Sequence, residues 1–184
     1  MQYLGKADLA KIFRVMHATN TVHHLAALTQ FYTGTRVSQL LDIRGEDIFR
    51  KNDKWVILIR AAKRGNEVTH SLHIDLDPAF DMTPLIELAK IKRQSRIFGS
   101  LDRHYFNKCL RKYADKAGIH SSFAHSHVFR HSVAIAIFDA TQRIGAVSQF
   151  LGHKSPSSSM CYLAEADGVR GQDAVDNLQL GVIS

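Results

Sequence analysis

The chain has 184 residues, 45% of them apolar, which suits one domain with a sizeable core and is too short for two ordinary domains. Its longest apolar run, residues 133–138, is far shorter than the roughly 20 residues that cross a bilayer, and the N-terminus has no apolar stretch typical of a signal peptide. The 24 Lys and Arg residues exceed the 17 Asp and Glu residues, and this excess alone points only mildly to a polyanionic partner.

The cysteines and the absence of repeats bound the class of protein further. Cys109 and Cys161 are too few for a disulfide framework, so we expect a reducing compartment and a cytoplasmic protein. No internal repeat or low-complexity segment divides the chain. We therefore expect a single domain over residues 1–184.

The N-terminal part of the sequence predicts three helices. Apolar residues at helical spacing mark an amphipathic helix over residues 6–18. Asn20 or Thr21 can cap a second helix, which Gly34 ends. A short third helix opens at Arg36.

Two β-rich runs follow, at residues 55–59 and 68–74, and the polar segment 63–66 joins them. The second run alternates apolar and polar residues, as a half-buried antiparallel strand does. This part of the chain predicts a small antiparallel sheet.

The second half of the chain is helical again. Pro84 suits the first turn of a helix that runs to about Lys92, and a basic helix over residues 102–117 is closed by Gly118. Further helices begin at Ser126 and cover residues 143–151. The pattern predicts an α+β fold that is mainly α-helical.

Residues able to act on a phosphodiester gather between positions 125 and 162. His127 and Arg130 are three residues apart and so lie on one face of a helix. Leu151-Gly152-His153 follows, and Tyr162 comes nine residues after His153. A guanidinium can grip phosphate oxygens, imidazoles can move protons, and a phenolate can attack phosphorus without a metal. His127 and His131 have the spacing of a zinc pair, but no third ligand completes it, so we expect neither a metal nor a cofactor.

These residues resemble a known family. HVFRH, LGH and Tyr162 resemble the HxLRH…LGH…Y motif of the tyrosine recombinases, the phage integrase family. YTGTRVSQLL, at residues 32–41, is similar to the YTGxRxSEL box that supplies the family's first arginine. The resemblance covers roughly residues 20–165. It implies the family's catalytic domain, with a small antiparallel three-stranded sheet.

The resemblance also implies roles for single residues. Arg36 and Arg130 would clamp the phosphate, and His127 and His153 would bind it and help to transfer protons. Tyr162 would be the nucleophile that forms a 3′-phosphotyrosyl intermediate. A phenol normally titrates near about pH 10, so these cations would also have to lower its pKa.

Two further positions bear on the resemblance to the family. Lys63 matches the hairpin lysine that would protonate the leaving 5′-oxygen. The alternative is that Lys63 is a solvated hairpin charge. Arg64 and Lys54 are nearby basic residues to which the family's lysine could also be aligned. Gln39 stands where the family usually has an acid, which predicts reduced or conditional activity. The nearby Glu46 and Asp47 are candidates to replace that acid.

The predicted function is site-specific recombination of double-stranded DNA, on which the protein would self-associate as a tetrameric synapse. Accessory DNA-bending proteins are further candidate partners. Basic side chains outside the motif are candidate contacts to the DNA backbone or simply solvated charges. They are Arg64, Arg103, Lys108, Arg111, Lys112 and Lys154.

Alternatives remain open on function and on domain organisation. A type IB topoisomerase shares the Arg, Lys and Tyr chemistry, and a catalytically weakened DNA-binding module is the other alternative. We expect no N-terminal core-binding domain, so the chain is either a catalytic fragment or a minimal recombinase. The tail, residues 163–184, either packs into a neighbouring protomer or folds as a final helix on its own core.

Overall fold

The computed structural model describes residues 3–61, 66–155 and 159–160. It confirms the mainly helical α+β fold with a small three-stranded antiparallel sheet. The helices are α1 (Lys6–Thr19), α2 (Thr21–Thr33), α3 (Val37–Asp42), α4 (Thr83–Lys92), α5 (Arg103–Lys116), α6 (Ser126–Thr141) and α7 (Ile144–Phe150). The strands are β1 (Ile48–Lys51), β2 (Lys54–Ile59) and β3 (Val68–Ser71), and short 3-10 turns cover Gly45–Asp47 and Ser121–Phe123. In this described part of the chain, no helix has both the length and the apolarity to cross a membrane.

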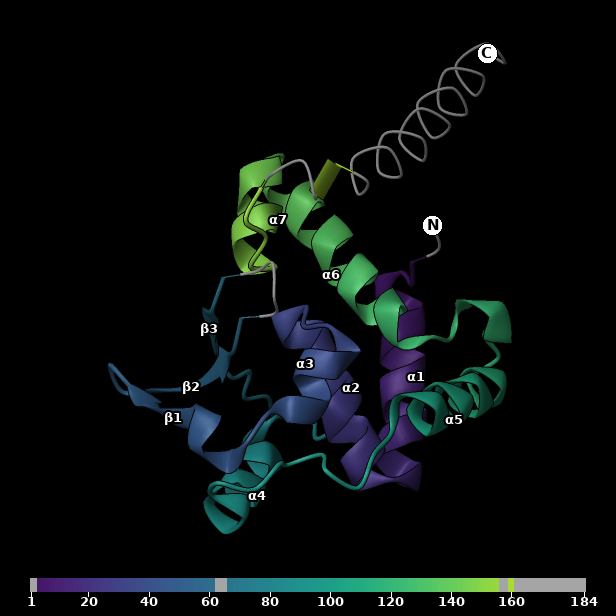
Figure 1. Ribbon diagram of the computed structural model, residues 1–184. Coiled ribbons are helices and arrows are strands. Elements are labelled where there is room, and N and C mark those ends of the chain that lie inside the picture. Colours follow the sequence, from purple (N-terminus) through teal and green to yellow (C-terminus); the bar gives the residue numbers. More distant parts are fainter. Residues whose placement is uncertain (1–2, 62–65, 156–158, 161–184) are drawn as a thin grey trace.

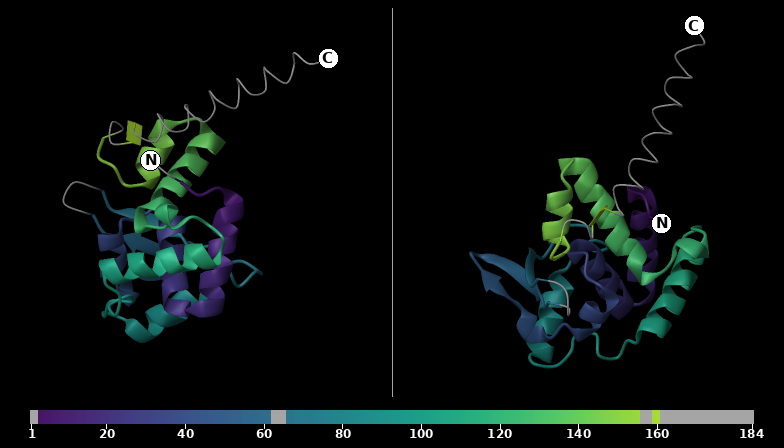
Figure 2. Two further views of the ribbon diagram at one scale, coloured as in Figure 1. Left: turned by 90° about the vertical axis from the view of Figure 1, so that its right-hand side faces the viewer. Right: turned by 45° about the horizontal axis from the view of Figure 1, so that its top comes forward.

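Helix α2 lies at the centre of the helical part and packs against both α1 and α6. The sheet lies on one side of the molecule and α5 on the other, with α2 and α3 between them (Figure 1), and the right-hand view of Figure 2 shows the same order. The rings of Phe13 and Phe129 stack at 5.6 Å between centroids and so join α1 to α6 in the core. A smaller apolar cluster joins the C-terminal half of α6 to α7 through Phe138, Val147 and Leu151.

The helix boundaries follow the capping residues in the sequence. The Asn20 side chain accepts a hydrogen bond from the His23 N–H at 2.9 Å, and Gly34 ends α2 in the left-handed region at φ 61°. The Asp102 carboxylate accepts from the His104 and Tyr105 N–H groups and so caps α5. The third helix begins at Val37, one residue later than the sequence indicated, and Arg36 is its N-cap.

The sheet has the order β1-β2-β3 and contains one strand that the β-rich runs did not reveal. Strand β1 pairs with β2 around a two-residue turn, Asn52-Asp53, whose φ angles are both positive, as in a type I′ hairpin. Strand β3 is shorter than residues 68–74, because the chain leaves the sheet after Leu72 and the His73 carbonyl accepts from the Met82 N–H at 3.0 Å.

Candidate functional site

Arg130 joins three segments that are far apart in the sequence. Its side chain projects from α6 and is only 4% exposed. The guanidinium donates to the carbonyls of Gly34 and Leu151, and it also contacts the His153 Nε2 atom at 2.6 Å. Because arginine has five donors and no acceptor, one planar group can hold all three partners at once.

Gly34 allows the end of α2 to reach this position. A Cβ atom here would lie 2.5 Å from the Leu151 Cδ2 atom, and the φ of 61° is unfavourable for other residues. The close approach fixes Arg36, two residues later, beside the same site. The positive charge of Arg36 contributes to lowering the pKa values of both His127 and His153, so its guanidinium lies near both imidazoles.

His153 lies between Arg130 and Ser159. Its Nδ1 atom is 2.7 Å from the Ser159 Oγ atom, and Ser159 is fully buried. Since a guanidinium only donates, Nε2 must accept from Arg130, and Nδ1 therefore carries the proton and donates to Ser159. Burial, followed by the charges of Arg130 and Arg36, lowers the pKa of His153 to about 4, so the ring is neutral at pH 7.

His127 lies one helical turn before Arg130 and is half-buried. Burial is the main cause that lowers its pKa, and the neighbouring charges of His125 and Arg103 add to the effect. The site therefore combines fixed guanidinium charges with two neutral imidazoles. This set suits the binding of a phosphate diester, whose oxygens can accept from arginine while the imidazoles exchange protons.

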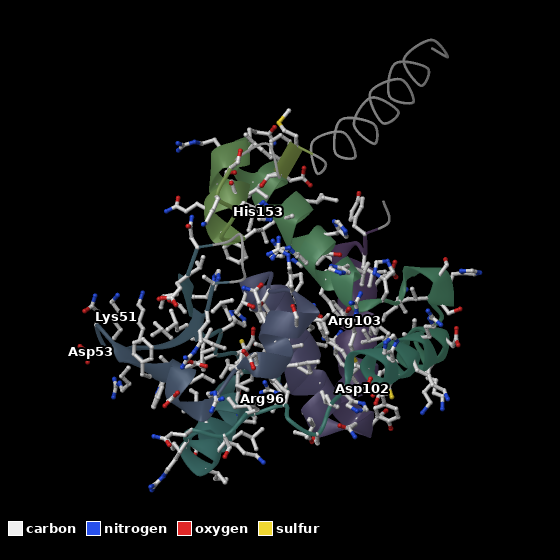
Figure 3. The ribbon with its side chains drawn as sticks, in the orientation of Figure 1. Lys51, Asp53, Arg96, Asp102, Arg103 and His153 are labelled. Carbon is white, nitrogen blue, oxygen red and sulfur yellow. The ribbon has the colours of Figure 1, made fainter. Side chains whose placement is uncertain are left out.

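Two of the proposed DNA contacts, Arg103 and Arg111, lie close to the helix that carries His127 and Arg130. Arg103 lies at the start of α5, beside α6, whereas Lys51 and Asp53 lie at the tip of the β1–β2 hairpin, far from His153 (Figure 3). Arg103 lowers the pKa of His127, and Arg111 lowers the pKa of His125, so both arginines are close to the N-terminal end of α6. The exposed candidates on described residues are Arg103, Lys108, Arg111, Lys112 and Lys154.

Three site predictions lie outside the described residues: Lys63, Arg64 and Tyr162. The tail, residues 163–184, lies outside them as well. In the segments that the structure does describe, no group of three or more His, Cys, Asp or Glu side chains is arranged to hold a metal ion.

The two acids considered as replacements at Gln39 have another partner. Asp47 is 2% exposed, and its Oδ1 atom lies 2.7 Å from an Arg60 nitrogen. Glu46 lies 3.0 Å from the same guanidinium, and together the two carboxylates raise the pKa of Arg60. Both acids are therefore engaged by Arg60.

Two residues of the site were not singled out by the sequence. Gly34 was recognised only as a helix end, and its contact with Leu151 is tertiary. Ser159 stands in a run of three serines, so its spacing from His153 gives no distinctive signal. Neither would be found without the fold.

The chain is similar to a known protein family and to several solved structures. The model of the phage integrase family matches residues 2–168. Tyrosine recombinase XerH of Campylobacter jejuni is 25% identical over 171 residues, which are 88% of this chain and 48% of that protein. Tyrosine recombinase XerA of Thermococcus kodakarensis is 22% identical over 167 residues, or 86% of this chain and 56% of that protein. The chain thus spans about half the length of these curated relatives.

Solved structures show the same fold at low sequence identity. XerH bound to its difH substrate before cleavage superposes with a TM-score of 0.70 at 19% identity, over 89% of this chain and 50% of that chain. The catalytic domain of bacteriophage HP1 integrase has a TM-score of 0.66 at 20% identity and covers 100% of this chain and 99% of its own. A lambda integrase tetramer on a Holliday junction has a TM-score of 0.60 at 18% identity, covering 84% and 47%.

Proposed function

Because the chain belongs to the phage integrase family, we propose that it is the catalytic domain of a site-specific DNA recombinase. The main support is the contact of Arg130 with both Gly34 and His153, which brings the TGTR box and the LGH motif to one point. Arg36 stands two residues after Gly34, so two guanidiniums are available for one phosphate. Such a pair stabilises the charge that develops on the phosphoryl oxygens.

The proposed chemistry is direct transfer of a DNA strand to Tyr162. The Tyr162 oxygen bonds to phosphorus, and the bond from phosphorus to the 5′-oxygen breaks, which leaves a 3′-phosphotyrosyl intermediate. His127 and His153 bind the phosphoryl group and help to transfer the phenol proton to water, and Lys63 protonates the departing 5′-oxygen. A 5′-hydroxyl from another strand reverses these steps, and no ATP or metal is consumed.

The proposed partners are double-stranded DNA with a specific site and further copies of this chain. The structures of XerH on difH and of a lambda integrase tetramer on a Holliday junction support this by analogy of fold. We further propose that four copies assemble on DNA as a synapse and exchange residues 163–184 between protomers. Accessory DNA-bending proteins are additional proposed partners. We place this activity in the cytoplasm.

Covalent capture tests the function directly. A pool of duplexes with a randomised core and a nick near each candidate cleavage position releases a short fragment after attack, so the adduct accumulates. We expect the wild type to form an adduct resistant to denaturant, Tyr162→Phe to form none, and Tyr105→Phe, which changes an exposed tyrosine, to retain it. Sequencing the captured DNA gives the target site. An adduct with Tyr162→Phe would overturn the assignment, and relaxation of plasmids lacking the site would favour the topoisomerase alternative.

A further inference from the structure

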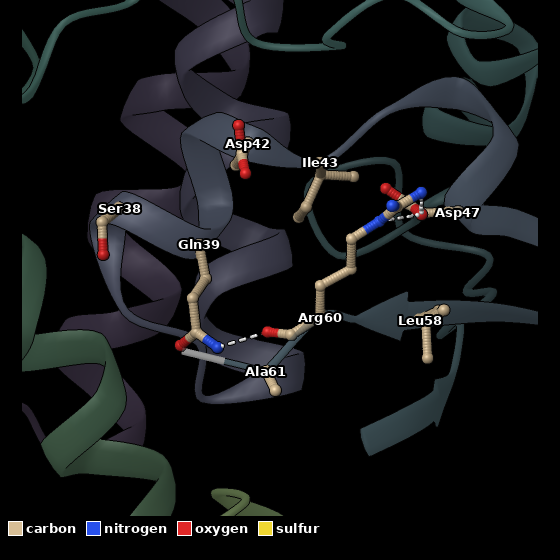
Figure 4. A pocket seen from close by; sticks show the side chains of 8 residues that line it. All are labelled: Ser38, Gln39, Asp42, Ile43, Asp47, Leu58, Arg60 and Ala61. Atoms are coloured by element: carbon tan, nitrogen blue, oxygen red, sulfur yellow. Dashed lines mark hydrogen bonds and ion pairs between the residues drawn. The ribbon is translucent and has the colours of Figure 1, made fainter. Parts of the chain in front are cut away.

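Gln39 makes two hydrogen bonds that a carboxylate at the same position could not make together. Its Oε1 atom accepts from the Arg36 backbone N–H at 3.3 Å. Its Nε2 atom donates to the Arg60 carbonyl at 2.8 Å, a bond that Figure 4 shows. The orientation of the amide follows from these partners, because one is a donor and the other an acceptor. Glutamate would keep the first bond and place an anionic oxygen against the Arg60 carbonyl.

Arg60 marks the point where the chain leaves β2. Its backbone is tied to α3 by Gln39, and its side chain binds Asp47 through Nε at 2.9 Å. Asp47 is itself fixed, because its second oxygen accepts from the Arg44 N–H at 2.8 Å. The exit from β2 is thus held beside α3, whose N-cap is Arg36.

The return of the chain into β3 is held by the LGH motif. The Asn66 N–H donates to the Gly152 carbonyl at 3.0 Å. A Cβ atom at Gly152 would lie 2.9 Å from the Asn66 carbonyl oxygen and 2.8 Å from the Val68 Cγ2 atom, and the φ there is +65°. Only glycine allows β3 to approach so closely, and His153 is the next residue.

We propose that Gln39 and Gly152 are positioning residues for the general acid: they hold Arg60 and Asn66, the described residues on either side of Lys63, at the TGTR box and at the LGH motif. The proposal rests on the proposed function, in which Lys63 is the general acid. Gln39 fixes Arg60 beside Arg36, and Gly152 fixes Asn66 beside His153. Gln39 therefore stands in place of the family's acid as a hydrogen-bond donor to the hairpin.

A substrate whose leaving group needs no proton separates this role from a general loss of structure. When sulfur replaces the 5′-bridging oxygen, the phosphorus–sulfur bond breaks and a thiolate leaves, because a thiol has a pKa of about 8.5 and does not have to be protonated. The Lys63→Ala variant is the reference. It should lose cleavage of the oxygen substrate and retain cleavage of the sulfur substrate. If it loses both, the role proposed for Lys63 fails, whatever the outcome at Gln39.

The Gln39→Glu variant tests the donor specifically, because it keeps the bond from the Arg36 N–H and loses the bond to the Arg60 carbonyl. It should cleave the oxygen substrate about tenfold more slowly, the cost of one lost hydrogen bond, and cleave the sulfur substrate within about twofold of the wild-type rate. Ser38→Ala, at the exposed neighbour on α3, should match the wild type on both. A Gln39→Glu variant as active as the wild type on oxygen, or equally slow on both substrates, overturns the proposal for Gln39.

Gly152→Ala tests the second attachment, with Gly145→Ala as its control. A Cβ atom at Gly145 meets no atom within 4 Å, so that change adds a methyl group without moving a neighbour. Gly152→Ala should lose oxygen cleavage by about tenfold or more and be restored by the sulfur leaving group, since the strain falls on Asn66 and Val68. Equal loss with both substrates would show that Gly152 instead supports Arg130 and His153.

Discussion

Arg130 donates a hydrogen bond to the carbonyl of Gly34, 96 residues earlier in the chain. The bond is buried, and the same guanidinium also reaches the Leu151 carbonyl and His153. Arg130 therefore holds separate segments of the fold together and is also a candidate phosphate ligand. A phosphate that enters can replace His153 as the acceptor for the Nη2–H of Arg130, because the planar group stays held by the two carbonyl contacts.

Arg130→Lys should remove both roles. A single ammonium cannot reach two carbonyls and an imidazole in the geometry of the planar fork. We expect adduct formation to fall by about 10²- to 10³-fold and the free energy of unfolding to fall by about 1–3 kcal/mol. Urea denaturation and the covalent capture assay measure the two effects. Arg96→Lys, at an exposed ion pair with Asp42, should change neither.

Gly34→Ala should destabilise the protein more than the same change at Gly118. Gly34 and Gly118 both have positive φ, at 61° and 71°, but only Gly34 has a neighbour in the path of a Cβ atom. Gly118→Ala should therefore cost only the backbone strain, about 1–2 kcal/mol. Gly34→Ala should cost about 1–3 kcal/mol more through the displacement of Leu151, and it should abolish adduct formation. Equal losses in the two variants would contradict the role given to the contact between Gly34 and Leu151.

Many elements of the fold could be predicted from the sequence because they carry local signals. Asp102 caps α5, apolar residues recur at helical spacing along it, and Gly118 follows its last turn. Strand β1 was missed because it has four residues, of which three are exposed and two are charged. Its existence depends on pairing with β2, which is tertiary information.

The candidate site, too, could be predicted only as far as local sequence patterns reach. The order of motifs predicted that Arg36 and Arg130 belong together, since each motif is a short local pattern. The arrangement that holds them could not be read, because Gly34 meets Leu151 only after α2, α6 and α7 have packed. The sequence showed only that Gln39 stands where the family usually has an acid, which predicted reduced or conditional activity. Its amide donates to Arg60, and that partner is 21 residues away.

Acid should destabilise the protein through two histidines. Burial lowers the pKa of His70 to about 4, and the pKa of His153 is also about 4. An unfolded histidine titrates near about 6.5, so between pH 6.5 and pH 4 the unfolded chain binds more protons than the folded one. The contribution of these two histidines to the free energy of unfolding should therefore be fully present above about pH 6.5. It should fall with decreasing pH, by at most about 1.4 kcal/mol per pH unit for each histidine.

Urea denaturation at pH 7.5 and at pH 5 tests the contribution of His70. This residue is buried on β3, and its ring packs against Phe150 of α7 at 4.6 Å between centroids. His70→Gln should make the pH dependence shallower, because only His153 of these two histidines then titrates. Phe150→Leu removes the same ring contact without removing a titrating group, so it should lower stability at both pH values and leave the slope unchanged. A slope as steep in His70→Gln as in the wild type would show that His70 does not contribute to it.

The basic face of α5 should account for part of the salt dependence of DNA binding. Each phosphate contact contributes about 0.9 to the slope of log affinity against log salt on duplex DNA, because one counterion is released. Arg103 and Arg111 lie near the histidines at the start of α6, so Arg103→Gln and Arg111→Gln should each reduce the slope by about one and weaken binding on all sequences alike. Lys90→Gln is the control, because Lys90 lies on α4, pairs with Glu87 and stands over the ring of Trp55 on β2. A slope that changes with Lys90→Gln and not with the α5 variants would place the DNA on the other side of the molecule.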